Sequence, residues 1–455
     1  MRTIRYLTLL LVTSVVTGFA QPVGFTLQQA VDYAVENGYS VRNKAFDYEI
    51  SKKTVKETAA SGLPQIGVGA EMNYNIDIPQ QPVPAQFIDP TAAEGEFVLL
   101  AFGVPYQSSY RANLNQLIFD GSYFVALMAS RVFKDISRLD LEESKTEITE
   151  QVYNAYGNVV ISKELISLLE DNLESSRKIL KENRSLFEEG FLEEQDVDQL
   201  EITVANLENN IEDVKNQSRI AMMTLKLIIG YPQNEALTLT DDINTFAELN
   251  EFAGEILETR FDLDTYVPYR SAETSERAAY LALRNEQMSY LPKLSGSLNY
   301  SRNNFSDDFN LFNLNNFSDD NAWVPFSILG LNLQWDIFTG LRRNARTQQA
   351  RIDLDRAQMN KKRVEEQAHI DYQQAKGDLN VAIKSMQTNK RNRDLAKKIL
   401  ENTRVKYREG LSGSLDLSQA ENQFLETERN YINALLQLVS ARAKLERLIG
   451  KYNTY

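Results

Sequence analysis

The stretch Leu117-Ile118-Phe119-Asp120-Gly121 decides the fold, because a close copy, Asp336-Ile337-Phe338-Thr339-Gly340, follows about 220 residues later. The other matching pairs, in chain order, are Leu63–Ile66 with Leu291–Leu294, Phe187–Gly190 with Tyr407–Gly410, and Leu227–Gly230 with Arg447–Gly450. Four matches in the same order predict two structural repeats. A linker at 231–266 is expected to join them.

Each repeat is expected to contain a short helix, a proline, two strands, a very long helix, a glycine turn and a return helix. Repeat one spans residues 21–230, repeat two spans 267–450, and a tail follows at 451–455. In repeat one we expect strands at about 66–78 and 105–118, the long helix at about 121–188 and the return helix at about 194–229. In repeat two we expect strands at about 294–304 and 326–338, then helices at about 340–408 and 414–449. Thr26 is a good N-cap for the first short helix.

The strands alternate strictly between apolar and polar residues. In the first strand one face carries Ile66, Val68, Ala70, Met72 and Tyr74. Such a period of two indicates one apolar and one wet face, and the lengths suit tilted transmembrane strands of about 9–11 residues. The alternative is a soluble sandwich, but the strands form only two hairpins, and their polar faces of Asn, Ser, Gly and Gln suit a water-filled lumen.

Four strands are too few to close a membrane barrel, which needs about eight. An open sheet edge cannot lie in lipid, so the barrel must be shared between subunits. This is a sequence-based argument for an oligomer. Residues 79–105 and 306–324 are then expected to be external loops, because they are rich in Asn, Asp, Gln and Pro.

Each long helix is uninterrupted by proline and reaches about 100 Å at about 1.5 Å per residue. The return helices show apolar residues at heptad spacing, which predicts coiled-coil packing. The heptad rows are Val197, Val204, Ile211, Ser218 and Leu225 with Leu200, Leu207, Val214, Ala221 and Ile228, and Leu417, Phe424, Tyr431, Leu438 and Leu445 with Ala420, Thr427, Ala434, Ala441 and Leu448. Heptads specify packing and not transport, so a coiled-coil spacer remains an alternative.

Residues 1–20 have the pattern of a secretory signal peptide. Arg2 and Arg5 precede a short apolar core, and Gly18-Phe19-Ala20 supplies small residues before a cut ahead of Gln21. The run is too short to be a comfortable transmembrane anchor. No later segment has about 18 uncharged apolar residues, so membrane insertion is expected through β-strands.

Composition narrows the function classes further. The 455 residues include no cysteine, which removes disulfides, thiolate metal sites and a lipid anchor on cysteine. The formal net charge of -14 argues against a broad nucleic-acid-binding surface. His369 is the only histidine, and no phosphate loop or nucleophile elbow is present. We therefore expect no metal, no cofactor and no enzymatic activity.

The doubled order of parts resembles the TolC-type outer-membrane efflux family over essentially the whole mature chain. The residues that carry the resemblance are Leu63-Pro64, Leu291-Pro292, Phe119-Asp120-Gly121, Phe338-Thr339-Gly340 and the turns at Gly190 and Gly410. The resemblance implies a mainly α-helical fold with membrane β-strands. In a homotrimer, four strands per subunit would form one twelve-stranded barrel, and antiparallel coiled-coil helices would form a periplasmic tunnel.

The resemblance also implies a gate near the hairpin tips at Gly190 and Gly410, where a periplasmic adaptor protein would dock. Asp416 matches an acidic constriction in the family, but the second family aspartate is replaced by Gln419. A simpler alternative for Asp416 is that an acid in the first turn of a helix complements the helix dipole.

Asp196 and Tyr407 match residues of the family's closing contacts, whereas Ser412 stands where the family has an arginine. The dipole alternative applies equally to Asp196. The resemblance therefore implies a gate at this end. Because of these departures, the sequence does not determine which contacts close it.

The expected function is the passive exit duct of a tripartite efflux or type I secretion system for small molecules or proteins. The resemblance implies a place in the outer membrane of a Gram-negative bacterium, contact with its lipid, and an inner-membrane pump of RND, ABC or MFS type as the energy source. The alternative is a periplasmic coiled-coil scaffold with a minor membrane anchor.

Overall fold

The computed structural model describes residues 23–243, 245, 251–309, 317–320 and 322–452. The predicted signal peptide at 1–20 lies outside these residues, as do parts of the predicted linker, second external loop and tail. The described chain divides into two compact units. The first holds the residues up to Ala45, Asp140–Tyr269 and those from Glu365 onward, and the second holds Phe46–Leu139 and Arg270–Val364.

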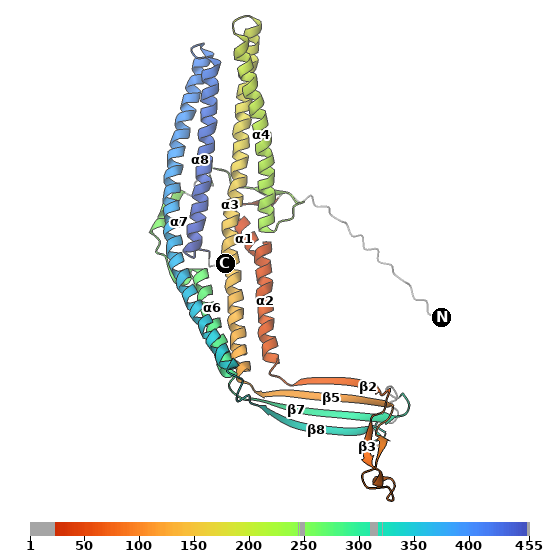
Figure 1. The fold of residues 1–455 in the computed structure, drawn as a ribbon. Coiled ribbons are helices and arrows are strands. Elements are labelled where there is room, and N and C mark those ends of the chain that lie inside the picture. Colours follow the sequence, from red (N-terminus) through yellow and green to blue (C-terminus); the bar gives the residue numbers. More distant parts are fainter. Residues whose placement is uncertain (1–22, 244, 246–250, 310–316, 321, 453–455) are drawn as a thin grey trace, which may run out of the picture. The chain divides into compact units, whose positions relative to one another are not determined.

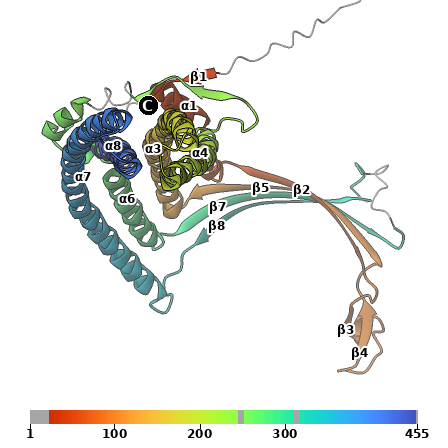
Figure 2. The same cartoon turned by 90° about the horizontal axis from the view of Figure 1, so that it is seen from above.

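Two helical hairpins turn within the first unit (Figure 1). In the first, α3 (Gly121–Glu188) is followed by α4 (Glu194–Ile229), and in the second, α7 (Arg342–Arg408) is followed by α8 (Ser414–Leu448). Figure 2 looks along these helices and shows α4 against α3 and α8 against α7. None of the helices in the described ranges contains a stretch long and apolar enough to cross a membrane.

The heptad rows of the return helices form the packing seams, as predicted. In α8, Leu417, Leu438 and Leu445 are at most 1 % exposed, and all ten row residues are buried or half-buried. The same holds for the rows of α4, where Leu200 and Leu225 are fully buried. Apolar burial at this spacing stabilises each hairpin, because the row residues lose most or part of their contact with water on packing.

The N-terminal helix α1 (Leu27–Asn37) packs into the core of the first unit. Thr26 caps it as predicted: its side chain accepts a hydrogen bond from the Gln29 backbone, and the Gln29 side chain accepts one from the Thr26 backbone. Two short strands that the sequence did not reveal, β1 (Val23–Phe25) and β6 (Leu237–Leu239), pair in parallel beside it. The 3-10 helices Glu251–Glu258 and Leu263–Thr265 complete the described part of the linker.

The second unit contains a four-stranded antiparallel sheet in the order β2-β5-β7-β8 (Figure 1). Its strands are β2 (Gln65–Tyr74), β5 (Tyr106–Phe119), β7 (Lys293–Ser306) and β8 (Val324–Gln334). The helices α2 (Tyr39–Ala60) and α6 (Val267–Met288) lead into its two hairpins. Neither β2 nor β8 has a second partner strand among the described residues, so the sheet has two free edges.

Two boundaries of the predicted strands differ from the structure. The first strand ends at Tyr74 and not near residue 78, because its partner β5 begins at Tyr106, directly after Pro105. Pro105 has no backbone N–H to donate, and the last backbone bond of this pair runs from the Asn75 N–H to the Pro105 carbonyl at 2.8 Å. The last strand ends at Gln334 and not near residue 338.

The first predicted external loop also contains secondary structure. Strands β3 (Gln80–Pro84) and β4 (Phe97–Ala101) form an antiparallel hairpin within residues 79–105. The segment predicted to be an external loop therefore contains paired strands that its composition did not indicate. Its two prolines, Pro82 and Pro84, are tolerated because β3 pairs on one edge only.

Candidate functional site

The tips of the two hairpins are built by the same backbone turn. Gly190 and Gly410 adopt positive φ values of 82° and 70°, in the left-handed region that glycine enters without steric cost. At the first tip the Phe191 N–H donates to the Leu186 carbonyl at 2.9 Å, and at the second the Leu411 N–H donates to the Lys406 carbonyl at 2.8 Å. These bonds are those of a Schellman motif, which closes a helix and reverses the chain.

Two of the predicted gate residues join the hairpins to each other. The Ser414 hydroxyl, in the first turn of α8, donates a hydrogen bond to the Asp196 carboxylate in the first turn of α4. The Asn183 amide on α3 donates to the Tyr407 hydroxyl on α7. Burial raises the pKa of Tyr407, so this hydroxyl stays protonated. Asp196 and Tyr407, one in each of these hydrogen bonds, are both half-buried.

Asp416 and Gln419 are placed differently. Both are exposed on the same face of α8, one turn apart. The Asp416 carboxylate accepts hydrogen bonds from the Gly413 N–H at 3.2 Å and from the Ser412 hydroxyl at 2.9 Å. These are contacts within its own helix end, and they fit the helix-dipole alternative for Asp416. Ser412 therefore acts locally, within its own helix end.

A buried polar cluster lies below the tip, about two helical turns from the start of α8. Arg404 on α7 donates to Glu421 on α8 at 3.1 Å and to Asn172 on α3 at 3.2 Å. The Ser176 hydroxyl on α3 donates to the other oxygen of Glu421 at 3.4 Å. Glu421 is only 4 % exposed, and burial raises the pKa of its carboxyl although Arg404 opposes the shift. The cluster therefore fastens the second hairpin to α3 of the first.

Apolar side chains are exposed at both tips. Phe191 follows the first turn glycine and is 74 % exposed, and Leu411 follows the second and is 77 % exposed. Leu415, in the first turn of α8, is 58 % exposed. Large apolar groups at equivalent places on two tips are typical of a surface that binds another protein.

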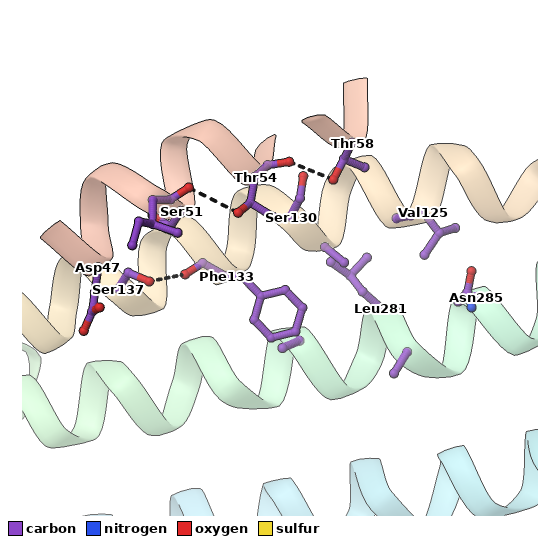
Figure 3. Close-up of a pocket in the computed structure, with 15 residues that line it drawn as sticks. Asp47, Ser51, Thr54, Thr58, Val125, Ser130, Phe133, Ser137, Leu281 and Asn285 are labelled. Carbon is purple, nitrogen blue, oxygen red and sulfur yellow. Dashed lines mark hydrogen bonds between the residues drawn. The ribbon is translucent and has the colours of Figure 1, made fainter. Parts of the chain in front are cut away.

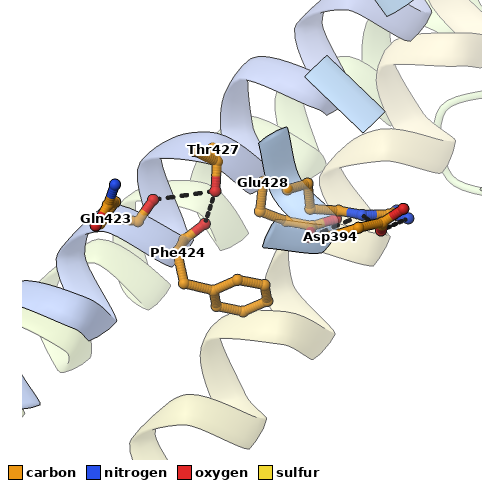
Figure 4. A network of polar contacts seen from close by, with 6 residues as sticks. Asp394, Gln423, Phe424, Thr427 and Glu428 are labelled. Carbon is orange, nitrogen blue, oxygen red and sulfur yellow. Dashed lines mark hydrogen bonds and ion pairs between the residues drawn. The ribbon is translucent and has the colours of Figure 1, made fainter. Parts of the chain in front are cut away.

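The second hairpin carries a further ion pair at its seam (Figure 4). Arg393 of α7 approaches Glu428 of α8 at 3.9 Å, and burial raises the pKa of the Glu428 carboxyl. The Thr427 hydroxyl points back to its own helix, 3.0 Å from the Gln423 carbonyl and 2.9 Å from that of Phe424. This polar residue of the heptad row thus satisfies its hydroxyl locally and can pack at the seam.

An apolar groove of about 550 Å³ lies in the second unit between α2, α3 and α6 (Figure 3). Hydroxyl-bearing residues line it, but each donates to a carbonyl of its own helix: Ser51, Thr54, Thr58, Ser130 and Ser137. The hydrogens of these hydroxyls are therefore already used, and the groove presents mainly carbon to its contents. None of the predicted site residues lies in it.

The two faces of the four-stranded sheet differ sharply. One face exposes large apolar side chains, including Val68 at 83 % and Leu329 at 81 %. The other carries mainly amides and hydroxyls, with one ion pair between Glu71 of β2 and Arg111 of β5, and it also holds the apolar Phe326 and Ile328 of β8. Membrane strands of a water-filled barrel have this division, with the apolar side toward lipid and the polar side toward the lumen.

Sequence reasoning missed Ser414, Asn183 and the Arg404–Glu421 cluster. Glu421 lies one turn after Leu417 but outside both heptad rows, and nothing in its spacing marks it as buried. Its burial depends on which side of the second hairpin faces α3. That information is carried by contacts between distant segments and not by a local pattern.

Comparison with known proteins identifies the chain's relatives. The family described as Outer membrane efflux protein matches residues 30–231 and 268–451. No curated protein sequence matches the chain. Among solved structures, CusC is similar with a TM-score of 0.70 and 14 % identity over 95 % of both chains.

Two further solved structures agree. The outer membrane protein VceC of Vibrio cholerae has a TM-score of 0.67 and 16 % identity, over 93 % of this chain and 96 % of its own. The CmeC outer membrane channel of Campylobacter jejuni has a TM-score of 0.70 and 17 % identity, over 93 % and 85 %. The predicted fold class, TolC-type with two repeats of strands and long helices, is confirmed. Because the family match covers most of both repeats, the chain belongs to the outer membrane efflux protein family.

Proposed function

We propose that three copies of this chain form a passive exit duct that carries cargo from an inner-membrane pump, through a periplasmic adaptor, to the cell exterior. Membership of the family makes the chain an outer-membrane efflux channel whose helices extend into the periplasm. The finer parts of the proposal are the trimer, the gate at the tips and the docking of an adaptor there. Small molecules and secreted proteins are both possible cargo for a duct of this kind.

The observation that carries the proposal is the four-stranded sheet. Its edges β2 and β8 are free among the described residues, one face is largely apolar and exposed, and the other is mainly polar. Free backbone edges in lipid cost several kcal/mol per unsatisfied group, so β2 of one copy must pair with β8 of the next. Three copies then give twelve strands around a polar lumen.

Planar-bilayer recording of the purified oligomer tests the duct. We expect stable conductance. A non-conducting monomer would favour the periplasmic scaffold. Because the chain has no native cysteine, single cysteines on β2 and β8 provide a second test. We expect a cysteine pair across these edges to crosslink separate copies, whereas pairs on the inner strands β5 and β7 should not.

We further propose that the tips form the gate. Asp196 with Ser414 and Asn183 with Tyr407 would hold the closed hairpins together, and Asp416 with Gln419 would line the constriction. The cross-hairpin hydrogen bonds support the first pairing. Ser414→Ala is expected to raise the open fraction of the channel. Asp416→Ala is expected to change conductance or cation selectivity, and an unchanged value across several pH values would leave Asp416 as a helix cap only.

The exposed apolar residues beyond Gly190 and Gly410 are proposed as the adaptor-docking surface. Phe191→Ser and Leu411→Ser remove apolar area that binding would bury. We expect these variants to lose export in cells while the purified oligomer keeps its conductance. Loss of conductance in the purified variants would show that the tips support the duct itself.

A further inference from the structure

The buried pair of repeat two has an exposed copy in repeat one. Arg184 of α3 forms an ion pair with Glu201 of α4, and these residues precede Arg404 and Glu421 by 220 positions each. The same spacing separates the turn glycines Gly190 and Gly410. The two pairs therefore occupy equivalent places on equivalent hairpins.

Their environments are opposite. In repeat two the side chains of Arg404 and Glu421 are 27 % and 5 % exposed, because α3 of the first hairpin covers them. In repeat one the side chains of Arg184 and Glu201 are 57 % and 46 % exposed. An ion pair of the same two residue types at the same two positions is thus covered in one repeat and uncovered in the other.

The covering surface is repeated as well. In the chain, the residue that receives Arg404 is Asn172 of α3, through its side-chain oxygen. Its counterpart in repeat two, again 220 positions later, is Asn392 of α7, and Asn392 is exposed. The hydroxyl of Ser176 has no counterpart, because Ala396 stands there. The chain therefore exposes the Arg184–Glu201 ion pair on its first hairpin and, on its second, Asn392, the counterpart of the amide that receives Arg404.

We infer that Arg184 and Glu201 dock against Asn392 of a neighbouring copy of this chain, repeating between copies the contact that Arg404 and Glu421 make with Asn172 within one. The contact joins unlike surfaces, so it is head-to-tail, and a head-to-tail contact that closes on itself produces a ring. Three copies would place six hairpins in such a ring, with covered pairs at every junction. The inference rests on the proposed oligomeric duct and names the surface that holds its helical part together.

A second copy suits this surface better than an unrelated partner for two reasons. The receptor for the pair is already present in the same chain, and the contact within the chain shows that this receptor binds this pair. The ring also uses both free surfaces of every copy. A partner of another kind would leave Asn392 without a role.

Cysteine crosslinking tests the inference, since the chain has no native cysteine. Glu201→Cys with Asn392→Cys replaces two exposed side chains, so the fold should be preserved. With a short bis-maleimide we expect covalent dimers and trimers on a denaturing gel. The matched pair Glu421→Cys with Asn172→Cys should instead give an internally linked monomer, and Asn392→Cys alone should give no ladder.

The outcomes separate this inference from the proposed function. If the 201/392 variant forms a conducting oligomer but yields no covalent ladder, the docking contact is wrong and the duct stands. If the purified chain forms no oligomer and does not conduct, the duct itself is wrong. A ladder from 201/392, with only the internally linked monomer from 172/421 and no ladder from Asn392→Cys alone, would support the assigned contact.

Discussion

Replacing Arg404 with methionine removes the guanidinium that faces the buried Glu421 carboxylate. In the native protein the two groups are 3.1 Å apart, and Ser176 donates to the second carboxylate oxygen. Methionine keeps the length of the side chain and its packing on α8. The change therefore isolates the loss of the charge partner from the loss of volume.

Breaking a buried ion pair from one side costs about 3–5 kcal/mol. Burial already raises the pKa of Glu421, so the carboxyl can lessen this cost by binding a proton, and we expect about 3 kcal/mol for Arg404→Met. Glu421→Gln keeps an acceptor for Arg404 and removes the buried charge, so it should cost only about 1 kcal/mol. The double variant should cost less than the sum of the two, because neither charge remains buried alone.

Amide hydrogen exchange of the solubilised oligomer measures these free energies locally, in α3 and α8 around the cluster. The matched control is Arg184→Met in repeat one, measured in dissociated chains, where it should cost about 0–1 kcal/mol because that pair is exposed. In the proposed ring the control should cost more than in the isolated chain. If Glu421→Gln were as costly as Arg404→Met, or if the two costs simply added, the account of a desolvated carboxylate would be refuted.

Three further predictions concern the turns, the pH response and the sheet. Gly410→Ala should cost about 1–2 kcal/mol, from the left-handed backbone alone, because the added Cβ would meet no atom within 4 Å. Gly230→Ala should cost several times more, because its Cβ would also lie 2.3 Å from the Asn37 carbonyl oxygen. Thermal unfolding of the two variants measures the difference. A raised pKa for Glu421 means that its contribution to stability is complete below the unfolded value of about 4.3 and is lost as pH rises through the folded value. The wild type should therefore gain stability relative to Glu421→Gln as pH falls through the raised folded value, and a flat difference in unfolding titrations would contradict this. At low salt, Glu71→Gln should make the channel more selective for anions, and Arg111→Gln should make it more selective for cations. The reversal potential measures both changes, and the double variant should return to the wild-type value.

Much of the fold could be predicted because its signals are local and repeated. Heptad spacing identified the buried rows of α4 and α8, and glycine followed by a return helix identified both tips. Strand alternation identified the apolar and polar faces of the sheet. These patterns depend on residues close in sequence, where the helical and strand periods fix which side chains share a face.

The rest depended on contacts that no local pattern carries. The β3–β4 hairpin has prolines in one strand and lies in a segment of loop-like composition, so its pairing was not visible. The bond from Ser414 to Asp196 joins residues far apart in the chain. Asp196 and Asp416 occupy the same place after their turns, yet only the structure distinguishes the acid that bridges the hairpins from the acid that caps its own helix.

The 220-residue correspondence between the repeats, which pairs Glu201 with Asn392 of the next copy, also predicts which tip residues meet between copies. Within the chain, Ser414 donates to Asp196, which is an attractive contact. The counterpart of Ser414 in repeat one is Glu194, and the counterpart of Asp196 in repeat two is Asp416, so the same contact between copies brings two carboxylates together. Two negative charges within hydrogen-bonding distance repel each other. The proposed ring is therefore held by polar contacts at every junction below the tip, whereas at the tip itself the junctions within a chain are closed and those between chains favour opening.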